Sequence, residues 1–144
     1  MYQHILVPTD GSELSSRAVQ TAAALARLTG ATLDVLSVKE PFPYSAISEM
    51  QPVPPQTFLD AQERMASARV TAALEAARAQ GVQASGATVE ALHPWEAILE
   101  QAKAKRCDLI VMASHGRRGL NALLLGSETQ KVLTHGTTPV LVIR

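Results

Sequence analysis

The sequence has few aromatic residues, a single cysteine and no net charge. Aromatic residues make up 3% of the 144 residues and apolar residues 47%, so the core must be built from Ala, Val, Leu and Ile. One cysteine, Cys107, cannot form an internal disulfide, and no Cys-x-x-Cys motif or Cys/His cluster suggests a zinc site. We interpret Cys107 as a small buried hydrophobic residue just before a strand.

The balance of charge and the lack of long apolar runs exclude further classes of protein. Thirteen basic residues offset thirteen acidic ones, which removes the overall basic character expected of a nucleic-acid-binding domain. No window approaches the ~20 apolar residues that a membrane span requires. Residues 1–4 contain no basic region ahead of a long apolar segment, so we expect no signal peptide. These features predict a cytoplasmic protein without nucleic-acid or membrane partners.

Short apolar runs alternate with segments of helical periodicity. Strands are expected at residues 5–7, 31–38, 82–92, 107–114 and 139–144, and helices at 13–29, 58–80, 94–106 and 128–135. Five strands alternating with four helices predict one α/β domain over residues 1–144, with an open, doubly wound parallel sheet and helices on both faces.

Turn-forming residues mark the boundaries of these elements. Ser12 is a candidate N-cap, and Gly30 stands where the first helix should stop. Gly86 is expected to weaken or bulge the third strand. Residues 39–57 contain five prolines, a density that neither a helix nor a central strand tolerates, and we interpret them as an insertion loop.

Two tight polar segments follow expected strands, residues 8–12 after the first and 113–127 after the fourth. In open parallel sheets, ligands bind beyond the carboxyl ends of the strands, where the strand order reverses. If the first and fourth strands are neighbours, Asp10 and the glycine-rich segment share one crevice.

Gly126 and Ser127 stand at the start of the last helix. A helix N-terminus presents unpaired N–H groups and a partial positive charge, which suit a phosphate, and the hydroxyls of Ser127 and Thr129 could add donors. The same residues also fit an ordinary turn with Ser127 as N-cap. No Lys follows the glycine, so the segment is not a Walker loop.

The spacing Ala113-x-x-Gly116, nine residues, then Gly126-Ser127 resembles the nucleotide-binding signature of the universal stress protein family. That signature is Gly, two residues, Gly, nine residues, then Gly followed by Ser or Thr. The likeness extends over nearly the whole chain, through "ILVPTDGSE", "DLIVMASHGRRG", "LLLGSETQKVL" and "TPVLVIR". It implies a Rossmann-like sheet of the adenine nucleotide alpha hydrolase type, with strand order 3-2-1-4-5.

The resemblance also implies an ATP site, with Mg²⁺ held by the phosphates. Asp10 would accept hydrogen bonds from ribose hydroxyls, Val38 would pack against adenine, and backbone amides near Gly126 would bind phosphates. The implied site comprises Pro8, Thr9, Asp10, Val38, Met112, Ala113, His115, Gly116, Gly126, Ser127, Glu128 and Thr129. The sequence departs from the signature at Ala113, whose methyl fits if the backbone there has negative φ.

The family resemblance further implies a homodimer that pairs its last strand across a two-fold axis, through Val140, Leu141, Val142 and Ile143. These residues include no charged side chain or proline of the kind that usually protects an edge strand from pairing with another chain. We expect a nucleotide-dependent regulatory module that acts on client proteins. Alternatives are a dimeric module of the same family that binds no nucleotide, and a weak ATPase, for which no second carboxylate stands near Asp10 as a base.

Overall fold

A computed structural model describes residues 1–43, 53–117 and 124–144 of the chain. Five parallel strands form one sheet in the order β3-β2-β1-β4-β5, which confirms the expected α/β fold and strand order. The strands are β1 (His4–Pro8), β2 (Thr32–Lys39), β3 (Ala84–Glu90), β4 (Leu109–Ala113) and β5 (Val140–Ile143). The helices are α1 (Glu13–Thr29), α2 (Gln56–Ala79), α3 (Pro94–Ala104) and α4 (Ser127–His135).

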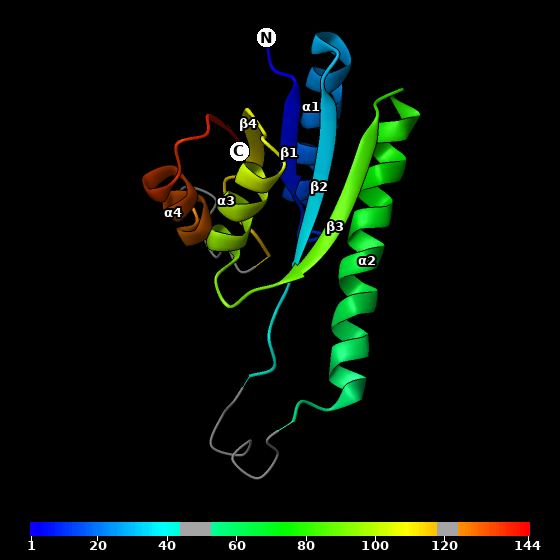
Figure 1. Cartoon of the computed structure of the whole chain (residues 1–144), viewed down its shortest axis with the longest axis vertical. Helices are drawn as coiled ribbons and strands as arrows, with labels where there is room; N and C mark the ends of the chain where they lie inside the picture. Colours follow the sequence, from blue (N-terminus) through cyan, green and yellow to red (C-terminus); the bar gives the residue numbers. More distant parts are fainter. Residues whose placement is uncertain (44–52, 118–123) are drawn as a thin grey trace.

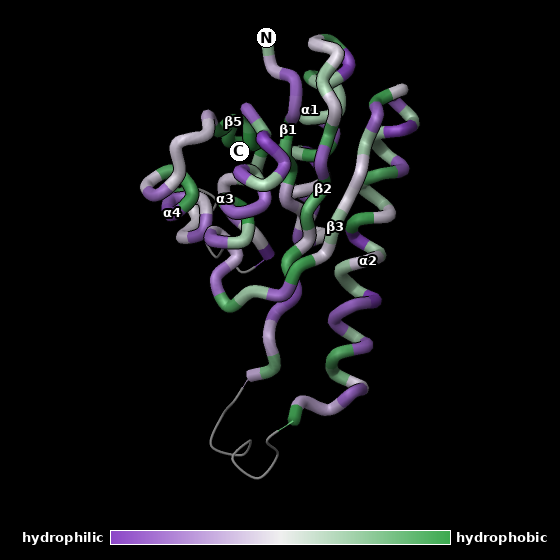
Figure 2. The backbone as a smooth tube through the Cα atoms, in the orientation of Figure 1, coloured by the Kyte–Doolittle hydropathy of each residue, from purple (hydrophilic) through white to green (hydrophobic). Residues whose placement is uncertain are grey.

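Helices cover both faces of the sheet, α1 and α2 on one face and α3 and α4 on the other (Figure 1). Ile5 and Val7 contact the first pair of helices, whereas Leu6 faces the second pair. All three side chains are fully buried, because a parallel sheet covered on both faces has no solvent-facing side. A helix that covers the sheet needs one apolar side only, and Figure 2 shows hydrophobic and hydrophilic residues in turn along α2.

The ends of α1 follow the predicted local chemistry. The Ser12 hydroxyl accepts a hydrogen bond from the Ser15 N–H at 3.2 Å, and Gly30 caps the other end with φ of 76°. A left-handed residue at this position lets the chain turn away while its N–H still bonds a helix carbonyl. Cys107 is buried as expected, and burial raises the pKa of its thiol to about 11.

Several boundaries differ from the expectation. Helix α2 begins at Gln56, after Pro55, rather than at Phe58, since a proline just ahead of a helix costs no hydrogen bond. Helix α3 ends at Ala104, and α4 already includes Ser127. The middle of the proline-rich insertion, residues 44–52, lies outside the described residues.

The third strand is not bulged at Gly86. Its pairing with β2 runs without interruption from Leu33–Ala84 to Lys39–Glu90. Gly86 is instead required by packing, because a Cβ at this position would collide with the side chain of Val70 on α2. The absence of a side chain thus brings α2 close to the sheet.

Adding a methyl group at Gly86 should therefore overpack this interface. We expect Gly86→Ala to lower the free energy of unfolding by about 1–3 kcal/mol. Val70→Ala should destabilise the protein by leaving a cavity, but the double variant should cost less than the sum of the two single changes. Urea unfolding of the four proteins measures this coupling, and additive effects would show that Val70 does not meet the new methyl group.

Candidate functional site

The carboxyl ends of β1 and β4 lie next to each other at the middle of the sheet. The segments that leave these strands, residues 8–12 and 113–117, therefore open at the same edge. The order of strands reverses at this point, since β1 is followed by β2 on one side and by β4 on the other. This is the location at which open α/β sheets bind their ligands.

Asp10 joins the two segments directly. One carboxylate oxygen accepts the Ser12 N–H at 2.9 Å, and the other accepts the Arg117 N–H at 2.8 Å. Burial by itself would raise the pKa of Asp10, but hydrogen bonds from Ser12, Arg117 and Ser15 outweigh it and lower the pKa below its ordinary value. The carboxylate is therefore ionised at neutral pH and held in one orientation.

Two glycines allow the glycine-rich segment to lie close to its neighbours. A Cβ on Gly116 would lie 2.6 Å from Asp10 Oδ2. A Cβ on Gly126 would lie 3.0 Å from the carbonyl oxygen of Ser114 and 3.1 Å from Cα of His115. The Gly126 N–H donates to that same carbonyl at 2.7 Å, so both ends of the segment are held against β4.

Gly126, and not Ser127, is the N-cap of α4, and no side chain caps the helix. The interpretation of Ser127 as an ordinary N-cap is therefore wrong. The backbone N–H groups of Ser127, Glu128 and Thr129 lie in the first helical turn, where the helix offers them no carbonyl partner. They point to the edge at which β4 ends.

The side chains of that first turn have structural partners. The Thr129 hydroxyl donates to the Ala113 carbonyl at 2.9 Å and is buried. The Glu128 carboxylate accepts the Trp95 N–H at 2.8 Å, which caps α3 where His93 makes no side-chain cap. The contribution of Glu128 and Thr129 to a ligand is thus limited to their backbone N–H groups.

Ala113 fits its position without strain. It is the last residue of β4 and pairs with Ile143 of β5. Among the described residues other than glycine, Arg106 alone has a positive φ, so the backbone at Ala113 does not need glycine. The departure from the family signature places a methyl group on an ordinary strand residue.

The remaining predicted residues line the end of the sheet. Pro8 ends β1, and the Thr9 N–H donates to the Leu36 carbonyl at 2.8 Å. Val38 and Met112 both belong to the hydrophobic cluster on the α3 and α4 face. Val38 is partly exposed at the end of β2, whereas Met112 is buried.

Ser114 was missed by the sequence analysis, although it organises the segment. It is buried, its N–H donates to the Ile143 carbonyl at 2.7 Å, and its own carbonyl holds Gly126. Its hydroxyl lies 3.2 Å from Nδ1 of His115. No local pattern distinguishes this serine from any other that follows a strand.

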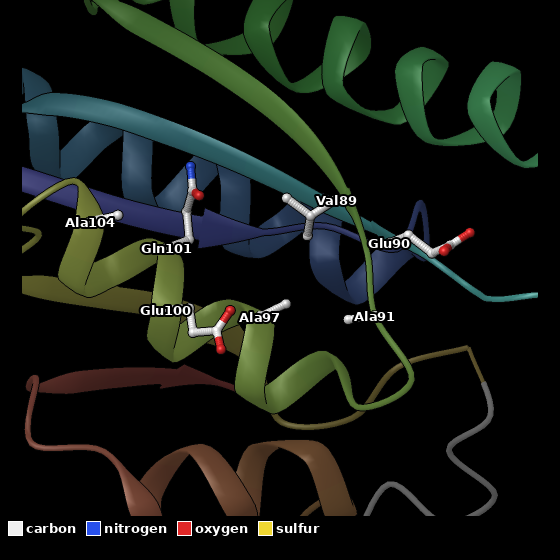
Figure 3. Close-up of a pocket in the computed structure, with 7 residues that line it drawn as sticks. All are labelled: Val89, Glu90, Ala91, Ala97, Glu100, Gln101 and Ala104. Atoms are coloured by element: carbon white, nitrogen blue, oxygen red, sulfur yellow. The ribbon is translucent and has the colours of Figure 1, made fainter.

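The described part of the chain has two hollows, one of them beside the crevice. One, of about 440 Å³, runs between α1 and α2 and includes Thr9, Gly11 and Arg69. The other, of about 250 Å³, lies between β3 and α3, where Val89 and Ala91 face Ala97 (Figure 3). The second is remote from Asp10 and contains none of the predicted site residues.

The strand order and the helices on both faces define an α/β protein of the doubly wound class. Residues 1–144 match the model of the universal stress protein family, and the chain belongs to that family. A universal stress protein of Thermus aquaticus is 35% identical over 144 residues, with both chains covered completely. The protein YxiE of Bacillus subtilis is 32% identical over 150 residues, again with full coverage of both.

Solved structures agree with this assignment. The structure of MJ0577, a universal stress protein of Methanocaldococcus jannaschii, has a TM-score of 0.84 at 27% identity and covers 99% of this chain and 96% of its own. A universal stress protein solved in complex with cAMP has a TM-score of 0.75 at 28% identity and covers 99% and 97%. None of the helices in the described residues is long and apolar enough to span a membrane.

Removing the charge of Asp10 should loosen the joint between the two segments. We expect Asp10→Asn to lower the free energy of unfolding at pH 7 by about 1–3 kcal/mol, since hydrogen bonds to a charged group are lost. The pKa of Asp10 is lowered in the folded state, so its contribution is present above the unfolded pKa and is lost as pH falls through the folded pKa.

Denaturant titrations of both proteins from pH 7 to pH 3 measure this effect. The difference between wild type and variant should be constant above about pH 5 and shrink below it. Asp60→Asn, at an exposed position on α2, controls for loss of one surface charge. If the stability difference between wild type and Asp10→Asn stayed the same at low pH, the ionised Asp10 carboxylate would not be its source.

Proposed function

We propose that this protein binds ATP in the crevice between the β1–α1 turn and the glycine-rich segment, and acts as a homodimeric, nucleotide-dependent regulatory module in the cytoplasm. The observation that carries the proposal is the joint at Asp10, which brings the two segments together at the strand reversal. Membership of the universal stress protein family and a relative in complex with cAMP, an adenine nucleotide, support the choice of ligand.

The crevice fits the parts of a nucleotide in order. Each oxygen of Asp10 accepts one backbone N–H, which leaves lone pairs for ribose hydroxyls. The partly exposed Val38, which packs on the same cluster as the buried Met112, would offer adenine an apolar contact on the same side of the sheet as α4. The first turn of α4 offers N–H groups and the positive end of the helix dipole to phosphates.

Two glycines of the segment bear on whether phosphates could fit in the crevice. At Gly126 and Gly116 a Cβ would occupy space next to His115 and Asp10, so the segment can approach only with bare backbone. No group of three His, Cys, Asp or Glu in residues 1–43, 53–117 and 124–144 could hold a metal. Mg²⁺ would accordingly be held by the phosphates, whose charge it would neutralise.

Binding, rather than hydrolysis, is the proposed role. The lowered pKa of Asp10 makes its carboxylate a weak general base at neutral pH. Both of its oxygens already hold the turn together, so the group is suited to orient a ligand. Nucleotide occupancy would then change the surface that client proteins meet.

ATP binding can be tested by measurement and by one substitution. Isothermal titration with ATP and Mg²⁺, and mass spectrometry of small molecules released from the fresh protein, should both detect the nucleotide. Gly126→Val should abolish binding, because the new side chain meets backbone atoms of Ser114 and His115. Ser127→Ala should retain binding within a few-fold, since the proposed contact there is the backbone N–H.

The fold must remain intact for this comparison. The Gly126→Val variant should keep its circular dichroism spectrum and its oligomeric state. A wild-type protein that co-purifies with no nucleotide, and whose melting temperature ATP with Mg²⁺ leaves unchanged, would refute the proposal in favour of an interaction module.

The proposed dimer rests on the open edge of β5. Strand β5 is the last in the sheet, and Leu141 on it is 39% exposed. The Pro139 carbonyl accepts a hydrogen bond from the N–H of Ile110 on β4, and the Ile143 carbonyl accepts one from the N–H of Ser114, just after β4. By alternation, the N–H and C=O groups of Val140 and Val142 face outward, ready to pair with a second copy.

A proline at position 142 tests this arrangement with little effect on the sheet itself. Because the Val142 N–H faces away from β4, Val142→Pro removes a donor from the outer edge alone. We expect a change from dimer to monomer in light scattering, with helix and strand content retained. Leu28→Thr, at an exposed position on α1 outside the proposed interface, should remain dimeric. A wild-type monomer, or a dimeric Val142→Pro variant, would contradict pairing through β5.

A further inference from the structure

Arg69 reaches from α2 to the turn that carries Asp10. A Cβ on Gly11 would lie 3.2 Å from both Cγ and Nε of Arg69. Gly11 follows Asp10 directly, and Asp10 Oδ2 holds the Arg117 N–H. The guanidinium of Arg69 therefore lies beside the joint between the two segments, although α2 is not adjacent to either in sequence.

The negative charges of Asp10 and Glu40 attract this guanidinium, but its N–H donors have no hydrogen-bond acceptor among the described residues. No ion pair and no hydrogen bond joins Arg69 to residues 1–43, 53–117 or 124–144. The ion pair within these residues is formed by Lys39 and Glu63 instead. The side chain is half-buried and carries five N–H donors. Because these donors are unpaired and the side chain is only partly buried, the guanidinium is available to hydrogen-bond an anion.

The charges around Arg69 are of both signs, and the repulsion from Arg117 is the largest single charge effect. Burial and then the nearby positive charge of Arg117 lower the pKa of Arg69, while the negative charges of Asp10 and Glu40 oppose this. Two guanidinium groups thus lie close enough to repel each other. A ligand with several negative charges would relieve that repulsion, and a neutral ligand would not.

We propose that Arg69 is a phosphate-recognition residue of the nucleotide site, and that its guanidinium makes the crevice select nucleoside triphosphates over nucleosides. The inference rests on the proposed function and adds a residue from α2 to it. A guanidinium matches the geometry of phosphate oxygens with two parallel hydrogen bonds. Its approach across Gly11 is possible because that residue has no side chain.

The test compares ATP, AMP and adenosine binding by isothermal titration to wild type and three variants of the full chain. Arg69→Gln should weaken ATP binding by about tenfold or more, as expected for the loss of a charge-assisted hydrogen bond. Its affinity for adenosine should stay within twofold of wild type. Arg69→Lys should retain part of the ATP affinity, because it keeps the charge but not the bidentate geometry. Arg64→Gln removes the same charge from an exposed position on α2 and should bind all three like wild type.

The outcomes separate this inference from the proposed function. If wild type binds ATP and Arg69→Gln binds it equally well, the role of Arg69 is refuted while the ATP site stands. If Arg69→Gln weakens ATP and adenosine to the same degree, Arg69 supports the turn and does not recognise phosphate. A wild-type protein that binds none of the three ligands refutes both proposals. Thermal melting of each variant confirms that it is folded.

Discussion

The Asp10 carboxylate is the constraint on which the geometry of the site depends. It accepts one hydrogen bond from its own turn, at Ser12, and one from Arg117, which is 107 residues away in sequence. Strand pairing brings β1 and β4 side by side, and this contact joins residues 8–12 to residues 113–117, the described part of the loop after β4. Because the donors are backbone N–H groups, the contact holds the carboxylate ionised without neutralising its charge. The two adjoining arginines and the carboxylates of Asp10 and Glu40 thus place charges of both signs around this contact.

A second set of contacts orients α4, whose first turn faces the crevice. Glu128 accepts the Trp95 N–H, Thr129 donates to Ala113, and at the other end of the helix His135 stacks on Trp95 with ring centroids 4.6 Å apart. Helix α3 is thus held by both ends of α4 through one residue. The first turn of α4 can offer its backbone N–H groups to a ligand because its side chains are already engaged elsewhere. Side chains position the helix, and the main chain is left for recognition.

Local chemistry made most of the fold predictable. Ser12 and Gly30 mark the ends of α1 as expected, and the alternation of strands and helices predicted the class of sheet. The spacing of Gly116 and Gly126 predicted where the segment needs bare backbone. Contacts between distant residues were not predictable, because no local pattern encodes them. The Glu128–Trp95 bond and the approach of Arg69 to Gly11 depend on how helices dock. Gly86 illustrates the same limit, since its role is set by Val70 on another element and not by its strand.

Ala113 shows how a departure from a signature can be compatible with its function. A glycine in a binding motif can serve either a positive φ or a close approach, and these two demands tolerate a methyl group differently. Strand pairing with Ile143 keeps Ala113 extended, so the first demand is absent here. Its carbonyl is also the acceptor for Thr129, which anchors α4 to β4 whatever side chain residue 113 carries. The main-chain role of position 113 is therefore preserved. What the methyl group can change is how closely a ligand approaches the end of β4.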